Sequence, residues 1–179
     1  WDDAALIFET PDGVIANIND MKLTKIDLDF IKNNFKIKYL FKQFSGASWY
    51  PMVYPYTDKE KDNISKKRII NKFNTFINVC KDLDSEYNFP TAWPTCFLDD
   101  DLIYLNTVSY SRFPDQSDFY KYCLTQNFKN IDVLLPGDSF NSKYLSKLTK
   151  KNLNNLCFTD KNQYLELYKN RRNFEINFH

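Results

Sequence analysis

This chain of 179 residues has a single histidine, His179, at its last position. A catalytic zinc or iron site normally needs three or four imidazole, thiolate or carboxylate ligands. The four cysteines, Cys80, Cys96, Cys123 and Cys157, are widely spaced and form no C-x-x-C pair, which argues against a zinc ribbon and predicts free thiols. We therefore expect that the isolated chain holds no di-metal centre. A Cys–His enzyme is also disfavoured, because it needs an oriented imidazole base.

The chain also lacks an excess of charge and a long apolar run. Its net charge of +1 gives no overall attraction to nucleic acid or to a membrane surface. Basic residues gather between positions 59 and 72, but Glu60 and Asp62 interrupt them, so the pattern favours a solvated helix face over a nucleic-acid patch. No apolar stretch approaches the roughly 20 residues of a membrane span. No signal-peptide pattern is visible at the start, and we expect a cytoplasmic protein.

Apolar residues are abundant and follow a mixed α/β pattern. Hydrophobic residues make up 43% of the chain and aromatic residues 17%, which is ample for the core of one domain. The pattern predicts strands over 4–9, 14–18, 37–41 and 131–135, and helices over 27–34, 59–83 and 115–128. Residues after about position 139 read as a peripheral helical tail. The expected fold class is α/β, with helices covering a mixed sheet.

The first candidate site lies at the end of the second predicted strand. Pro11-Asp12-Gly13 joins the first two strands by a tight turn, and the second strand leads into Asn19 and Asp20. A carboxylate at the end of a strand is rigidly mounted, which suits a metal or substrate site. Asn and Asp also favour turns, so the local pattern alone favours the interpretation that these two residues simply cap the next turn.

The second candidate site is the loop after the third predicted strand. Ser45 and Ser48 leave the backbone approachable, while Trp49 and Tyr50 offer flat apolar faces with polar tips. Such a mixture can line a substrate pocket. The alternative is an ordinary packed loop with two anchoring aromatic residues, since aromatic side chains mostly serve packing.

Three adjacent carboxylates, at positions 99 to 101, and two prolines mark the middle of the chain. Consecutive residues on an extended strand point to opposite sides, so these carboxylates could not all face one ion, and a solvated turn between two strands is the better interpretation. Pro90 and Pro94 argue against a continuous central strand, because proline has no amide to donate. Asp138, after the strand predicted at 131–135, is a second carboxylate at a strand end.

Four segments in this order resemble the second half of a metallo-β-lactamase-fold enzyme. They are WDDAALIFETPDGVIANIND, FKQFSGASWYPMVYPY, CFLDDDLIYLN and VLLPGD, spread over residues 1–138. The resemblance is to the branch related to CMP-N-acetylneuraminate hydroxylase. It implies the second half of an αββα sandwich over 1–138, followed by a helical tail over 139–179.

The resemblance also implies a function and a set of site residues. Asp20 would be a metal ligand, and Ser45, Ser48, Trp49, Tyr50 and Trp93 would lie near the substrate. The complete protein would be a metal-dependent hydrolase or hydroxylase, using zinc or iron on a small molecule such as a sugar or nucleotide-sugar.

The family's first metal motif, His-x-His-x-Asp-His, is absent from this chain, so the resemblance makes the missing N-terminal half a partner, in the same polypeptide or as a separate chain. The Rieske centre of the hydroxylase, which takes two Cys and two His ligands, cannot form here either. The chain would then be either a piece of a longer enzyme or a stand-alone relative without the chemistry. The rival hypothesis is a non-catalytic binding or assembly module.

Overall fold

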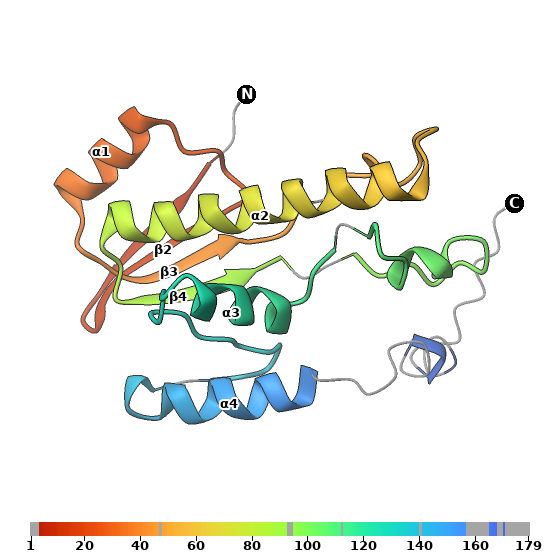
Figure 1. Ribbon diagram of the computed structural model, residues 1–179. Coiled ribbons are helices and arrows are strands. Elements are labelled where there is room, and N and C mark those ends of the chain that lie inside the picture. Colours follow the sequence, from red (N-terminus) through yellow and green to blue (C-terminus); the bar gives the residue numbers. More distant parts are fainter. Residues whose placement is uncertain are drawn as a thin grey trace, which may run out of the picture.

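The computed structural model describes residues 4–46, 48–92, 95–111, 113–139, 141–156, 165–167 and 170, with only the backbone given for Ser142. Within these residues, the assigned elements are four strands, four α-helices and two short 3-10 helices, η1 and η2 (Figure 1). In chain order they are β1 (Leu6–Thr10), β2 (Gly13–Asn19), α1 (Lys25–Asn34), β3 (Ile37–Gln43), α2 (Asp58–Leu83), β4 (Tyr87–Thr91), η1 (Ile103–Asn106), α3 (Gln116–Thr125), η2 (Ser142–Tyr144) and α4 (Leu145–Leu156).

The four strands form one mixed sheet in the order β1-β2-β3-β4. The β1–β2 pair is antiparallel, whereas β2–β3 and β3–β4 are parallel. Helices α1 and α2 provide the crossovers of the two parallel pairs, as expected for a parallel connection. The α/β class predicted from the sequence is therefore confirmed. Within the described residues, nothing identifies this sheet as one half of a metallo-β-lactamase sandwich.

The predicted hairpin between β1 and β2 is confirmed, and Gly13 is the residue that makes it possible. Thr10 pairs with Gly13, whose φ of 127° lies in the region that favours glycine. A Cβ at this position would lie 2.6 Å from Cδ of Lys38 on the neighbouring strand. Any larger residue would therefore be strained and would displace the Lys38 side chain.

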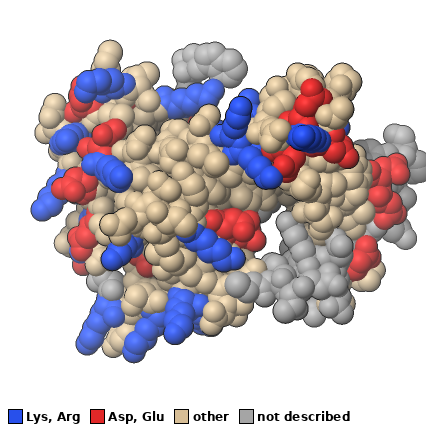
Figure 2. Space-filling view, viewed as in Figure 1, with Lys and Arg blue, Asp and Glu red and all other residues tan. Residues whose placement is uncertain are grey.

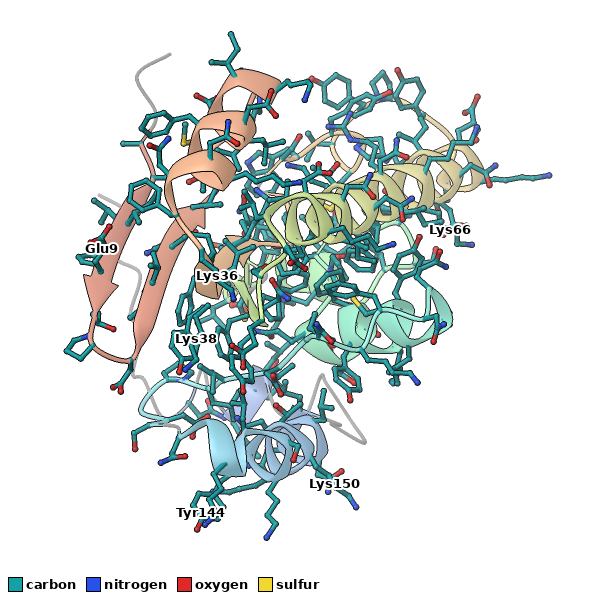
Figure 3. The ribbon with its side chains drawn as sticks, turned by 90° about the vertical axis from the view of Figure 1, so that its left-hand side faces the viewer. Glu9, Lys36, Lys38, Lys66, Tyr144 and Lys150 are labelled. Atoms are coloured by element: carbon teal, nitrogen blue, oxygen red, sulfur yellow. The ribbon has the colours of Figure 1, made fainter. Side chains whose placement is uncertain are left out.

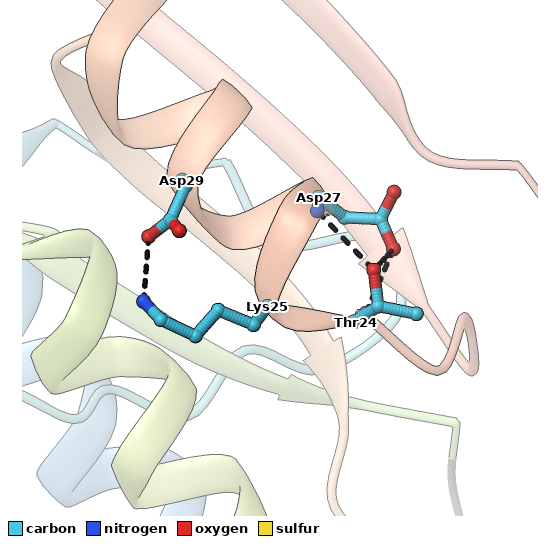
Figure 4. A network of polar contacts seen from close by, with 4 residues as sticks. All are labelled: Thr24, Lys25, Asp27 and Asp29. Carbon is cyan, nitrogen blue, oxygen red and sulfur yellow. Dashed lines mark hydrogen bonds and ion pairs between the residues drawn. The ribbon is translucent and has the colours of Figure 1, made fainter.

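Helix α1 begins two residues earlier than its hydrophobic pattern predicted, because a capping box sets its start (Figure 4). The Thr24 hydroxyl accepts from the amide of Asp27 at 3.3 Å, and the Asp27 carboxylate accepts from the amide of Thr24 at 2.7 Å. These two bonds satisfy amides that have no partner within a helix. Lys25 and Asp29 add an exposed ion pair one turn apart, at 3.0 Å.

Helix α2 covers one face of the sheet and forms the main core with it. Its buried residues Phe73, Phe76, Ile77, Cys80 and Leu83 lie along one side of the helix at the spacing of an amphipathic helix, in the range predicted as helical. They pack with buried residues of β2, β3 and α3 in one hydrophobic cluster. The N-cap is Thr57, two residues before the start of the predicted helix, and its hydroxyl accepts from the amide of Glu60 at 3.4 Å.

The strand predicted at 131–135 is wrong, and Pro90 offers a physical reason. The amide of Asp132 donates to the carbonyl of Asn88 at 2.9 Å, a contact of the kind that would begin a parallel pair with β4. In a parallel pair the carbonyl of Asp132 would next accept from the amide of residue 90. That residue is Pro90, which has no N–H to donate. The amides of Val133 and Leu135 bond instead to the side chains of Thr149 and Asp138.

The strand predicted after the acidic triplet is also wrong. Ile103–Asn106 forms η1, which belongs to a second, smaller hydrophobic cluster around Met52, Phe97, Leu105 and Phe113. The predicted division of the chain at position 138 stays a prediction. Thr149 and Asn152 of α4 hydrogen-bond to residues 132, 133 and 138, on the other side of this division. In the described ranges, no helix combines the length and the apolar composition needed to span a bilayer.

Candidate functional site

The parallel strands β2, β3 and β4 end along one edge of the sheet, where α/β proteins usually bind ligands. Asp20 follows β2 at this edge and is exposed. The Asn19 side-chain amide donates to its carboxylate at 3.1 Å, and Asn19 itself has a φ of 45°. Asn tolerates this left-handed conformation better than most residues. The structure thus places Asp20 at the edge of the sheet where α/β proteins usually bind ligands. Its role as a metal ligand stays a prediction.

The predicted loop residues Ser45 and Ser48 use their hydroxyls within the protein. Ser45 is 4% exposed, and its hydroxyl donates to the carbonyl of Ala92 at 3.1 Å, which ties the end of β3 to the end of β4. The Ser48 hydroxyl accepts from the amide of Tyr50 at 3.3 Å. Both contacts shape the loop. Trp93, the fifth residue of the predicted pocket, lies outside the described residues.

The two aromatic residues of the loop belong to different clusters. The Trp49 ring lies 5.0 Å from the Phe97 ring, although 46% of Trp49 remains exposed. The Tyr50 ring packs edge-on against Tyr54 at 4.9 Å, and the Arg68 guanidinium lies 5.1 Å from its centroid. These contacts match the packed-loop alternative. The predicted binding of a substrate by Trp49 and Tyr50 stays a prediction.

Lys42 is the unusual residue that the sequence analysis missed at this edge. It is 6% exposed, and its ammonium group donates to the carbonyl of Met21 at 3.5 Å, the outer limit of a hydrogen bond. Burial lowers the pKa of its amine below the usual value, with a further contribution from the charge of Lys72. The signal was available, since Lys42 is two positions after the core residue Leu40 and so faces the same side of the strand.

A second buried polar group, Gln116, lies at the start of α3. It is 0% exposed, and within the described part of the chain neither atom of its side-chain amide has a hydrogen-bond partner. The hydroxyl of Thr91, at the end of β4, is buried and unpartnered in the same sense. Unpaired buried polar groups destabilise a fold by about 1–3 kcal/mol each. The pattern of apolar residues gave no indication of them.

The acidic triplet forms the turn predicted from the sequence. The Asp99 carboxylate accepts from the amide of Asp101 at 2.9 Å, and the amide of Leu102 donates to the carbonyl of Asp99 at 3.1 Å. Asp100 and Asp101 are exposed. The Asp99 carboxylate is therefore engaged in the turn itself, and nothing in its geometry indicates a metal site.

The thiols of the core are poor metal ligands. Burial raises the pKa of Cys80 well above its usual value, and burial raises that of Cys123 to about 12. Because their pKa values are raised, both thiols stay protonated at neutral pH. The thiolate is the form that binds metal, so neither is a good ligand. Across the described ranges, no three or more His, Cys, Asp and Glu side chains are grouped closely enough to hold an ion. Cys157 and His179 lie outside these ranges.

Comparison with known proteins shows three related chains. The sequence is 30% identical over 180 residues to a protein from Mycolicibacterium smegmatis, and 27% identical over 179 residues to proteins from two strains of Mycobacterium tuberculosis. All three are named Rieske 2Fe-2S iron-sulfur proteins. Each alignment covers 94% of this chain but 34% of the relative, so the chain spans about a third of the length of the curated relatives it matches. No protein-family profile and no solved structure matches it.

The metallo-β-lactamase resemblance is therefore wrong. The relatives match nearly the whole chain and carry the name of an iron-sulfur class instead. The hydrolase and hydroxylase functions inferred from that resemblance are therefore also wrong. Each of the four segments that suggested it was only moderately specific.

Proposed function

We propose that this chain is a cluster-free structural segment of an iron–sulfur electron-transfer protein. The alignment with proteins named Rieske 2Fe-2S iron-sulfur proteins over 94% of the chain carries the proposal. The cluster itself would be held by the part of such a protein that lies outside the matched third.

The donor set of this chain does not fit a Rieske cluster. Such a cluster takes two cysteines on one iron and two histidines on the other. The sequence has a single histidine, so the second pair of ligands cannot be completed. Among the described cysteines, Cys80 and Cys123 are buried, and burial raises the pKa of both thiols, which keeps them in the protonated form at neutral pH. We therefore assign no step of electron transfer to residues of this chain.

The sheet offers an apolar face on which a further part of the protein can pack. Cross-strand pairing places Leu6 and Phe8 of β1 on the same side as Tyr39 and Phe41 of β3, by way of their shared partners in β2. The opposite side carries the core with α1 and α2 (Figure 3). Leu6 is 57% exposed and Phe8 is 50% exposed. Covering such side chains stabilises an assembly by about 25 cal/mol per Å² of apolar surface.

Anaerobic reconstitution with ferrous iron and sulfide tests the absence of a cluster site. We expect no iron and no acid-labile sulfide to remain after desalting, and no signal in electron paramagnetic resonance after reduction. Iron and sulfide retained in equal, stoichiometric amounts would overturn the proposal. A chimaera in which this chain replaces the matched third of the M. smegmatis relative tests the role directly. It should keep a Rieske-type resonance, and a folded chimaera without one would contradict the proposal.

Light scattering across a concentration range tests the apolar face. The isolated chain should self-associate through this face, because an exposed apolar sheet promotes association. Phe8→Lys should reduce the association. Ile26→Lys is the matched control, since Ile26 is 81% exposed but lies on α1, away from the sheet face. Equal effects of the two variants, or a strictly monomeric wild type, would show that the face does not bind.

A further inference from the structure

The surface around α4 is strongly basic. From Ser139 to Leu156 the sequence has four lysines and no acidic residue, although the whole chain has a net charge of only +1. The four lysines, all exposed, are Lys143, Lys147, Lys150 and Lys151, and we call this surface the α4 basic face. Figure 2 shows basic side chains along the lower edge of the molecule, where Figure 1 places α4. Figure 3 shows Lys150 pointing outward from α4.

Hydrogen bonds on the inner side of α4 fix which side of the helix faces out. The Thr149 hydroxyl donates to the Asp132 carboxylate at 2.8 Å and accepts from the amide of Val133 at 3.2 Å. The Asn152 side chain donates to the carbonyl of Val133 at 2.8 Å and to the Asp138 carboxylate at 2.6 Å. The lysines are thereby held on the outer side, as a preorganised set of charges.

The same hydrogen bonds engage the neighbouring carboxylates. Asp138 accepts from Asn152 and from the amide of Leu135, and Asp132 accepts from Thr149. In the described part of the chain, the ion pairs lie on α1 and α2, and none of the α4 lysines takes part in one. The positive charge of the face is therefore available to an external anion.

The face also has a contour and an apolar component. A depression of about 490 Å³ is lined by Ser139, Asn141, Tyr144, Lys147, Leu148 and Lys151. Tyr144 is 53% exposed, and the ammonium groups of Lys143 and Lys147 lie 5.7 Å and 6.0 Å from its ring centroid. A half-exposed tyrosine beside lysines, with Leu148 in the depression, combines the apolar anchor and the polar rim of a protein interface.

We propose that the α4 basic face docks an acidic surface of a partner protein, whose aspartate and glutamate carboxylates meet the four lysines around Tyr144. The lysines from 143 to 151 extend over only about 12 Å at the helical rise of 1.5 Å per residue. A nucleic acid follows a longer stripe of charge on a domain of high isoelectric point, whereas this chain has a pI of about 7.7. The inference does not depend on the presence of an iron–sulfur cluster in a longer protein.

Charge reversal on α4 tests the proposal in the full chain. One double variant carries Lys147→Glu and Lys150→Glu on α4. The other, its matched control, carries Lys59→Glu and Lys67→Glu on α2. Both pairs of lysines are exposed, and both variants carry the same net charge. The probe is a fluorescein-labelled oligoglutamate peptide, and binding is followed by fluorescence anisotropy at low and at physiological ionic strength.

We expect the α4 variant to bind the peptide about tenfold more weakly, the α2 variant to change about twofold at most, and salt to weaken binding in the wild type. Tyr144→Ala should also weaken binding. An equal loss in the two double variants, or no binding by the wild type, would overturn the proposal. A DNA duplex that binds more tightly than the peptide through the same lysines would overturn it in favour of a nucleic acid. If the glutamates disturb folding, Lys147→Gln with Lys150→Gln gives the same comparison.

Discussion

Replacing Lys42 with methionine should make the protein more stable. Lys42 is 6% exposed, and its ammonium group has one weak contact, at 3.5 Å to a carbonyl. Burying a charge that is not well paired is unfavourable, and replacing even a buried ion pair with apolar residues of similar volume often stabilises by about 1–4 kcal/mol. Methionine fills nearly the same space as the lysine stem. We expect a gain of about 1 kcal/mol, and a melting temperature higher by about 3 °C for a chain of this size.

The effect should depend on pH in a defined direction. Burial lowers the pKa of the Lys42 amine in the folded state, so the folded chain loses this proton at a lower pH than the unfolded chain does. Below the folded pKa both states carry the charge, and the full unfavourable contribution is present. As pH rises from the folded pKa toward 10.5, only the unfolded state keeps the proton, and the contribution decreases. The advantage of Lys42→Met should therefore be largest at neutral pH and should shrink at alkaline pH.

Urea unfolding followed by circular dichroism, at neutral and at alkaline pH, measures both effects. Lys42→Ala is the matched control, because it removes the same charge and also leaves a cavity. It should be about 2 kcal/mol less stable than Lys42→Met, from three methylene-sized groups at about 0.8 kcal/mol each. If Lys42→Met lost more than about 1 kcal/mol, with an unchanged pH dependence, the amine would be favourably held in the folded state and the reasoning would be refuted.

Three further predictions concern the core, a cap and the thiols. Phe76→Ala should lower the free energy of unfolding by about 3–5 kcal/mol, since Phe76 is 0% exposed, whereas Leu124→Ala, at 49% exposed, should cost under about 1 kcal/mol in the same urea titration. Thr57→Ala should cost about 1 kcal/mol and Thr57→Ser much less, because the hydroxyl caps α2. Cys96 is exposed and should react quickly with a thiol reagent, whereas Cys80, whose pKa is raised by burial, should react only on unfolding; rapid modification of Cys80, mapped by mass spectrometry, would contradict its placement.

Local chemistry made the first strands and the helices predictable. The hairpin through Gly13 and the apolar stripe of α2 follow from residues close together in the sequence, so their patterns were sufficient. The start of α3 agrees with the helix predicted over 115–128, and in the structure Asp115 is its N-cap and Asp118 completes the capping box. The start of α1 was misplaced by two residues, because its capping box at Thr24 was not recognised.

The errors came from pairings between distant residues. Residues 131–135 have the composition of a strand, but whether they join the sheet depends on Pro90, some 40 positions earlier. At the candidate site, Asp20 lies at the end of the predicted second strand, while Lys42 was missed although strand alternation places it on the same side as the core residue Leu40. A local pattern cannot show which partner a segment will meet.

The sequence by itself determined that this chain cannot complete a Rieske cluster, because a count of histidines needs no coordinates. It also determined the α/β class, through short-range periodicity that reflects the geometry of helices and strands. Only the tertiary structure decided the outward direction of the α4 lysines and the exposure of Leu6 and Phe8 on one side of the sheet. The first follows from hydrogen bonds between α4 and residues 132–138, and the second from strand register together with the packing of the helices on the other face of the sheet. The whole fold decides both arrangements.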